Sequence, residues 1–150
     1  MTDLTKGIIE INGFTFRPGT RIDEVLNFFG SAVRTLELSS GVKVKFLQRF
    51  YITEDLYSYA FNFGKDGVLN RLSLIPVAPA NLIGDPVKTA TYKLAVAKKW
   101  LKGMLTCEPN TINDSCVYYK FSSVDYYASI RTDLHYGLTG GEIEVSFHEV

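Results

Sequence analysis

The sequence has few of the residues from which metal and redox sites are built: two cysteines and two histidines among 150 residues. Cys107 and Cys116 form no CxxC pair, and together with His135 and His148 they are too few for a metal centre, so we expect neither a metal nor a cofactor. The cysteines flank the polar residues 108–115. Two free thiols fit a reducing cytosol, and a disulfide across this loop is the alternative.

Long apolar runs and an excess of charge of one sign are also missing. Nowhere do about 18 apolar residues follow one another, which argues against a membrane-spanning helix, and the opening MTDLTKGIIEINGF lacks the apolar core of a signal peptide. Sixteen basic residues balance sixteen acidic ones, so the chain lacks the positive field of most nucleic-acid binders. We therefore expect a cytoplasmic protein that binds neither membranes nor nucleic acid.

Aromatic and apolar residues are abundant: the sequence is 46% hydrophobic and contains nine Tyr and ten Phe. Such a composition is typical of a globular protein, and aromatic residues favour strands. A chain of this length fits one medium domain. Residues 1–150 are therefore expected to form a single sheet-rich domain.

The clearest pattern is a predicted hairpin over residues 57–76, with its turn at Asp66-Gly67. In the first arm aromatic residues alternate with small or polar ones, the period-two signature of a strand with one apolar face. In the second arm one face is expected to hold Val68, Leu72 and Leu74, and the other Leu69, Arg71 and Ser73. Asn12-Gly13 predicts a smaller hairpin over residues 7–17.

Two helices are predicted. Thr20 with Asp23 three residues later resembles a capping box, the following apolar residues lie at helical spacing, and Gly30 provides a stop. Residues 88–105 place Leu94, Leu101 and other apolar residues on one helical side. Lysines occupy the other side, and we interpret them as a solvated face rather than an anion site.

Further strands are predicted over residues 33–38, 42–52, 117–121, 124–131 and 142–148. The proline-rich residues 76–86 predict a linker, and the glycine-rich residues 134–141 a loop that matches no phosphate-binding motif. The elements together predict an α+β fold, a mainly antiparallel twisted sheet with two main helices packed on one face. Because helix followed by strands occurs in residues 18–76 and again in 86–150, we hypothesise two tandem α-β-β-β units.

No group of residues predicts catalysis. Cys107 or Cys116 could be combined with His135 and Asp133 as nucleophile, base and orienting acid. However, His135 lies in a glycine-flanked loop, and neither cysteine sits at a recognisable nucleophile elbow. The sequence therefore predicts no catalytic residue.

Residues 16–30, FRPGTRIDEVLNFFG, precede aromatic strands that end in LSLIP at residues 72–76. This arrangement resembles small bacterial proteins with tandem helix-plus-sheet units, similar to the beta-lactamase inhibitor protein fold and to some immunity proteins of toxin systems. The resemblance implies a non-enzymatic protein-binding module, an immunity or inhibitor protein that blocks a partner protein, such as a toxin, by occlusion. The alternative is a small-molecule-binding or enzymatic domain with a pocket between helices and sheet.

Strand alternation predicts where a partner would bind. The inward set, facing the helices, is expected to be Val42, Val44, Phe46, Leu72, Leu74, Tyr126, Ala128, Ile130, Ile143, Val145 and Phe147. The opposite, partner-binding set is expected to be Arg49, Tyr51, Arg71, Tyr127, Arg131, Glu144 and His148. Tyr and Arg are over-represented at interface hot spots, and the competing interpretation is an open face solvated by mixed charges.

Overall fold

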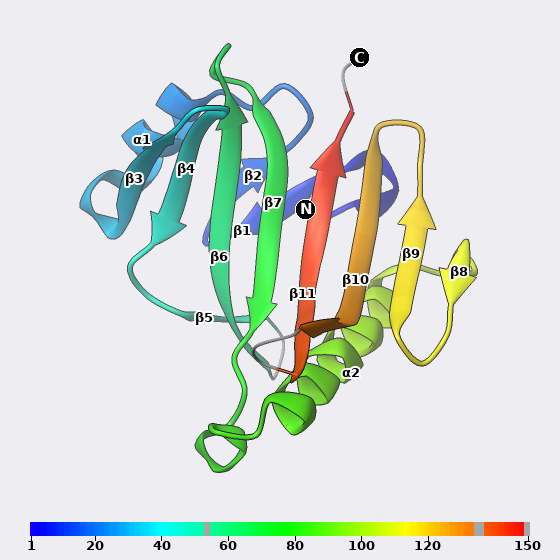
Figure 1. The fold of residues 1–150 in the computed structure, drawn as a ribbon. Coiled ribbons are helices and arrows are strands. Elements are labelled where there is room, and N and C mark those ends of the chain that lie inside the picture. Colours follow the sequence, from blue (N-terminus) through cyan, green and yellow to red (C-terminus); the bar gives the residue numbers. More distant parts are fainter. Residues whose placement is uncertain (53–54, 134–136, 149–150) are drawn as a thin grey trace.

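The computed structural model describes residues 1–52, 55–133 and 137–148 (Figure 1). Its helices are α1 (Ile22–Phe29) and α2 (Pro86–Met104), with short 3-10 turns at Leu4–Lys6, Gly30–Ala32 and Ala80–Leu82. Its strands are β1 (Ile9–Ile11), β2 (Phe14–Phe16), β3 (Val33–Leu38), β4 (Gly41–Phe46), β5 (Phe50–Ile52), β6 (Asp55–Gly64), β7 (Leu69–Pro76), β8 (Thr111–Ile112), β9 (Cys116–Lys120), β10 (Val124–Asp133) and β11 (Gly137–Phe147).

One antiparallel sheet organises the molecule. Its strands run in the order β3-β4-β6-β7-β11-β10-β9-β8, and β5 pairs with β6 beside this path. Figure 1 shows α1, α2 and the β1–β2 hairpin behind the sheet, whereas no described helix lies in front of it. We call these the covered face and the open face. The predicted α+β fold, with two helices on one face of a mainly antiparallel sheet, is confirmed.

The predicted central hairpin forms as β6 and β7. Tyr59 pairs with Leu74 and Phe61 with Leu72, and all four side chains are buried on the covered face. The register then shifts, because Asn62 pairs with Arg71 but the next pair is Phe63 with Leu69. This shift turns Leu69 into the core, where it is 3% exposed, so its predicted outward position is wrong.

The β1–β2 hairpin also forms as predicted. Asn12 and Gly13 both adopt positive φ, 52° and 82°, as a two-residue hairpin turn requires. Phe16 of this hairpin stacks on Phe61 of the sheet with ring centroids 4.3 Å apart. The Tyr126 hydroxyl donates a buried hydrogen bond of 2.6 Å to the Leu4 carbonyl. The N-terminal segment is thus tied to the covered face by packing and by a hydrogen bond.

The predicted cap of α1 is wrong. Arg21 is the N-cap, and its backbone N–H donates to the Glu24 carboxylate at 2.8 Å. The Thr20 hydroxyl instead accepts a bond from the Arg17 N–H, and the Thr20 carbonyl accepts one from the Leu69 N–H. Thr20 is therefore drawn into a contact with the start of β7, which moves the cap by one residue.

The long helix α2 begins at Pro86, two residues before its predicted start. The Asp85 side chain accepts a bond from the Lys88 N–H at 3.1 Å, and proline suits the first turn because its missing N–H has no intrahelical partner there. The predicted apolar stripe faces the sheet, since Leu94 and Leu101 are buried. Gly141 of β11 lets the helix approach closely: a Cβ there would lie 2.4 Å from the Lys93 Cβ.

Two predicted boundaries are wrong because tertiary pairing overrides local composition. Residues 42–52 do not form one strand, since the chain leaves the sheet after Phe46 and β5 then pairs with the start of β6. Residues 137–141 belong to β11 rather than to a loop, and a bulge opposite Ser129 accommodates Gly140 and Gly141 at positive φ. The predicted loop residues 134–136 lie outside the described residues.

The strands of the two hypothesised units meet at β7 and β11 in the middle of the sheet. From this junction, β7, β6, β4 and β3 follow one another outward, and β11, β10, β9 and β8 follow in the other direction. The predicted linker contains the end of β7 and the 3-10 turn Ala80–Leu82. This mirrored order agrees with the tandem-unit hypothesis, which stays a hypothesis until the two units are superposed.

Candidate protein-binding face

The open face follows from the alternation that buries the covered face. All eleven residues predicted to point at the helices are buried or pack against the core. Their neighbours along each strand must therefore face the other way. In the middle of the open face, Ser73, Glu144, Tyr127 and Tyr118 lie opposite one another on β7, β11, β10 and β9.

An ion pair and two aromatic rings occupy this central row. Arg71 Nε lies 3.2 Å from Glu144 Oε2, and both side chains are partly exposed. Tyr127 lies directly opposite Glu144 and is 43% exposed. The rings of Tyr127 and Tyr118 meet edge to face, 6.0 Å apart. Charged and aromatic groups therefore lie side by side across four adjacent strands.

Asp125 joins residues from two neighbouring strands. Its Oδ2 accepts a hydrogen bond of 3.2 Å from the Tyr118 hydroxyl and lies 3.1 Å from His148 Nε2. The second carboxylate oxygen, Oδ1, is buried and has no partner among the described residues. Partial burial, and then the nearby Asp125 carboxylate, raise the pKa of Tyr118 above its ordinary value. The neutral Tyr118 hydroxyl therefore acts as a hydrogen-bond donor to Asp125 on this face.

Arg131 extends the open face beyond the bulge in β11. It pairs with Thr139 and lines a shallow hollow of about 490 Å³ together with Tyr127, Cys116 and Asp114. Tyr127 and Arg131 are therefore accessible from one side of the molecule and border the same depression.

Of the seven predicted partner-binding residues, Arg71, Tyr127 and Glu144 lie side by side in the middle of the open face. Arg131 and His148 lie four residues beyond this row, in opposite directions along the strands. Arg71, Tyr127, Arg131, Glu144 and His148 lie on β7, β10 and β11 or directly after it.

Tyr51 lies on β5 opposite Leu56 of β6. Arg71 pairs with Asn62, six residues further along β6, so Tyr51 and Arg71 are roughly 20 Å apart. Arg49 lies in the connection before β5. Because residues 42–52 do not form one strand, Arg49 and Tyr51 lie away from the central row. Their part in partner binding stays a prediction.

Sequence reasoning missed Tyr118 and Asp125 as members of this face. The signal was available, because Val117 and Tyr119 are buried on β9, as Val124 and Tyr126 are on β10. The residues between them must then point to the open face. Their interaction with each other required the register of the two strands, which the sequence pattern alone does not give.

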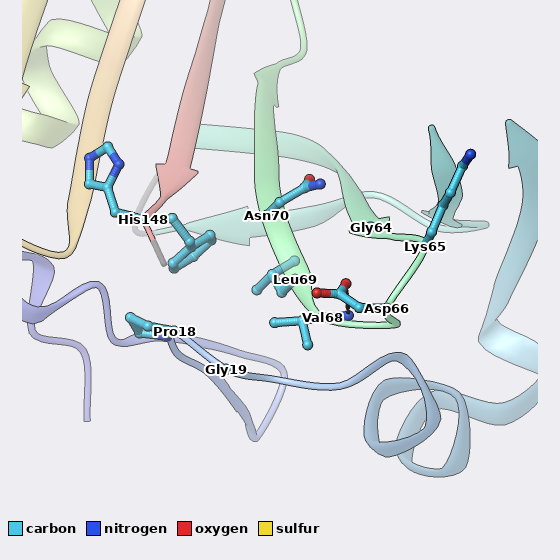
Figure 2. A pocket seen from close by; sticks show the side chains of 10 residues that line it. Pro18, Gly19, Gly64, Lys65, Asp66, Val68, Leu69, Asn70 and His148 are labelled. Atoms are coloured by element: carbon cyan, nitrogen blue, oxygen red, sulfur yellow. Dashed lines mark hydrogen bonds between the residues drawn. The ribbon is translucent and has the colours of Figure 1, made fainter. Parts of the chain in front are cut away.

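A hollow of about 710 Å³ lies at one end of the sheet (Figure 2). Figure 2 shows His148 at one end of it and Lys65 at the other, with Pro18, Val68 and Leu69 between them. The titratable groups that line the hollow do not converge on one point, as an acid–base site requires. This hollow at the end of the sheet therefore lacks the arrangement of an acid–base site.

The other chemistry considered from the sequence lacks a described site. Cys107 and Cys116 are free thiols, and His135 lies outside the described residues. Within residues 1–52, 55–133 and 137–148, no three His, Cys, Asp or Glu side chains are grouped as metal ligands. None of the helices in the described parts of the chain has the length and apolar character needed to cross a membrane.

Comparison with protein-family models, with curated proteins and with solved structures found no match for this chain. The resemblance to inhibitor and immunity proteins therefore stays an expectation from the sequence. The functional argument rests on the geometry of the open face.

Proposed function

We propose that this chain is a non-enzymatic protein-binding module that blocks a partner protein by covering part of its surface, as an immunity or inhibitor protein does. The observation that supports this proposal most directly is the uncovered face of the sheet, on which Arg71, Glu144 and Tyr127 lie side by side. The helices of the described residues lie on the other side of the sheet.

The dimensions of the open face suit a protein partner. Eight strands have seven spacings of about 4.8 Å, which makes the face roughly 34 Å wide, and six residues of strand make it roughly 20 Å long. The resulting area of roughly 700 Å² is close to the ~800 Å² that each partner contributes to a typical stable interface. Occlusion by such a face requires no cleft, in agreement with the shallow relief around Arg131.

The residues on this face also suit protein recognition. Tyr and Arg supply large contact area and several donors, and they are enriched at interface hot spots. Tyr118 and Tyr127 are positioned by their mutual contact, and Arg71 is positioned by Glu144. Such preorganisation lowers the entropy lost on binding.

The test is a pull-down from a native lysate followed by affinity measurement with the purified partner. We expect Tyr127→Ala and Arg131→Ala each to weaken binding at least tenfold, roughly 1.4 kcal/mol, without changing thermal unfolding. Lys102→Ala is the matched control, because Lys102 is exposed on α2 behind the sheet. Unchanged affinity in both open-face variants, or a loss with Lys102→Ala, would contradict the proposal.

A further inference from the structure

β3 forms one edge of the sheet and has backbone groups that no described strand pairs. β3 is the first strand in the sheet order and pairs only with β4 among the described strands. The Leu47 N–H donates to the Ala32 carbonyl at 3.0 Å and continues this ladder. In an antiparallel pair, hydrogen-bonded and non-hydrogen-bonded positions alternate. Arg34, Leu36 and Leu38 therefore bond to β4, and the backbone groups of Thr35 and Glu37 point away from the sheet.

The side chains along this edge are apolar and basic on the open face. Leu36 is 56% exposed and Leu38 is 45% exposed. Arg34 is on the same face, and the register places Lys43 and Lys45 beside it on β4. The open-face positions of β3, β4 and β6 include no carboxylate, whereas Glu37 lies opposite Val42 and so points to the covered side.

The two edge strands of the sheet, β3 and β8, differ in length. Natural sheets protect exposed edges by short strands, charges, bulges or covering loops, because free backbone donors and acceptors recruit further strands. At the opposite edge, β8 has two residues, whereas β3 has six. The β3 edge combines free backbone groups with exposed leucines and is long enough for another strand to pair with it.

We propose that β3 binds an extended, acidic segment of a partner protein as an additional antiparallel or parallel strand. The segment would place apolar side chains opposite Leu36 and Leu38, and carboxylates within reach of Arg34 and Lys45. Backbone hydrogen bonds to Thr35 and Glu37 supply affinity, and the alternating side chains supply specificity. A second copy of this chain fits less well, because two-fold pairing would place the cationic side chains of both copies on one face without carboxylates to neutralise them.

This inference rests on the proposed protein-binding function but assigns it a second contact, at the sheet edge. It is tested with a capped, fluorescein-labelled peptide, Glu-Thr-Val-Thr-Val-Thr-Glu, whose valines and glutamates share one strand face. The control peptide has Lys in place of both Glu residues. Fluorescence anisotropy gives affinity, and amide hydrogen exchange at Thr35 and Glu37 reports whether the edge is paired.

We expect saturating acidic peptide to slow exchange of the Thr35 and Glu37 amides at least tenfold and the lysine peptide to bind at least tenfold more weakly. Leu36→Lys should weaken binding of the acidic peptide at least tenfold. Ile112→Lys, which alters an exposed aliphatic residue (60% exposed) on β8 at the opposite edge of the sheet, should change it less than twofold. Both sites are exposed, so both variants are expected to fold.

Three results would overturn the edge proposal. The first is unchanged amide exchange at Thr35 and Glu37 with the acidic peptide, and the second is equal binding of the two peptides. The third is amide exchange at these residues that slows with rising protein concentration when no peptide is present. The last would identify a second copy as the occupant. Tyr127→Ala and Arg131→Ala should leave peptide binding unchanged. Failure of the peptide experiment with loss of partner binding in those two variants would reject the edge site and retain the open-face function.

Discussion

The two faces of the same sheet differ in how their side chains are used. On the covered face, Phe61, Leu72 and Val145 are 0% exposed and pack beneath helices and the N-terminal hairpin. On the open face, Arg71 and Glu144 directly precede Leu72 and Val145 on β7 and β11, and Tyr127 lies opposite Glu144 on β10, yet all three reach solvent. Stability should therefore depend on one face, and binding on the other.

The largest expected effect is on the covered face. Leu101 is fully buried between α2 and the sheet, and burying a charged side chain without a partner is far more costly than losing apolar contacts. Leu101→Asp should unfold the domain, with loss of the cooperative transition in circular dichroism. Lys102→Asp at the next, exposed position is the control. A folded Leu101→Asp variant with an unchanged melting curve would show that α2 is assigned to the wrong side.

Alkaline pH should also destabilise the covered face. Burial, the largest cause, raises the pKa of Tyr57, Tyr59 and Tyr126 well above the ordinary value of 10.0. A pKa that is higher in the folded state means that folding favours the neutral hydroxyl. The stabilisation that the buried neutral hydroxyls give is fully present below about pH 10, the pKa of the unfolded state. It is lost as the pH rises from there toward the higher pKa of the folded state.

Urea unfolding between about pH 8 and pH 11 checks this expectation, with tyrosinate absorbance recorded in parallel. The free energy of unfolding should fall above about pH 10. Tyr126→Phe should reduce the slope, whereas Tyr51→Phe should not, because Tyr51 is 70% exposed. A pH-independent free energy over this range would contradict the burial of these hydroxyls.

A smaller effect is expected where α2 crosses β11. Gly141 has φ of 92°, and an added Cβ would lie 2.4 Å from the Lys93 Cβ and 2.9 Å from the Ala90 carbonyl oxygen. Gly141→Ala should lower the free energy of unfolding by at least about 2 kcal/mol, from strain and overpacking. Gly84→Ala separates the two causes, because Gly84 has φ of 95° but nothing within 4 Å of the added Cβ. Equal losses in both variants would mean that close helix packing contributes nothing.

The smallest effect on stability is expected for the ion pair on the open face. Arg71 and Glu144 side chains are 53% and 33% exposed, and such pairs contribute about 0 to 1 kcal/mol. A double-mutant cycle of Arg71→Ala and Glu144→Ala, measured by urea unfolding, should give a coupling energy below about 1 kcal/mol that decreases with salt. A larger, salt-independent coupling would mean that the open face contributes to folding as well as to binding.

Local pattern was sufficient where a segment's own residues control its structure. The Asn12-Gly13 turn, the aromatic alternation from Tyr57 to Phe63 and the apolar stripe of α2 all depend on neighbours within a few residues. The inward set was confirmed for the same reason, since the extended backbone of a strand points successive side chains to opposite faces. The sequence thereby determined the α+β class and the polarity of the two faces.

Tertiary structure decided what depends on distant partners. Thr20 leaves the helix cap because Leu69 bonds to it, and Gly137–Gly141 continues β11 because β10 pairs with it and α2 needs a glycine beneath it. The strand order that joins β7 to β11, and so gathers Arg71, Glu144 and Tyr127 while leaving Arg49 and Tyr51 aside, is likewise absent from any local pattern. Strand pairing joins residues far apart in the chain, and its register is fixed only when the whole core packs.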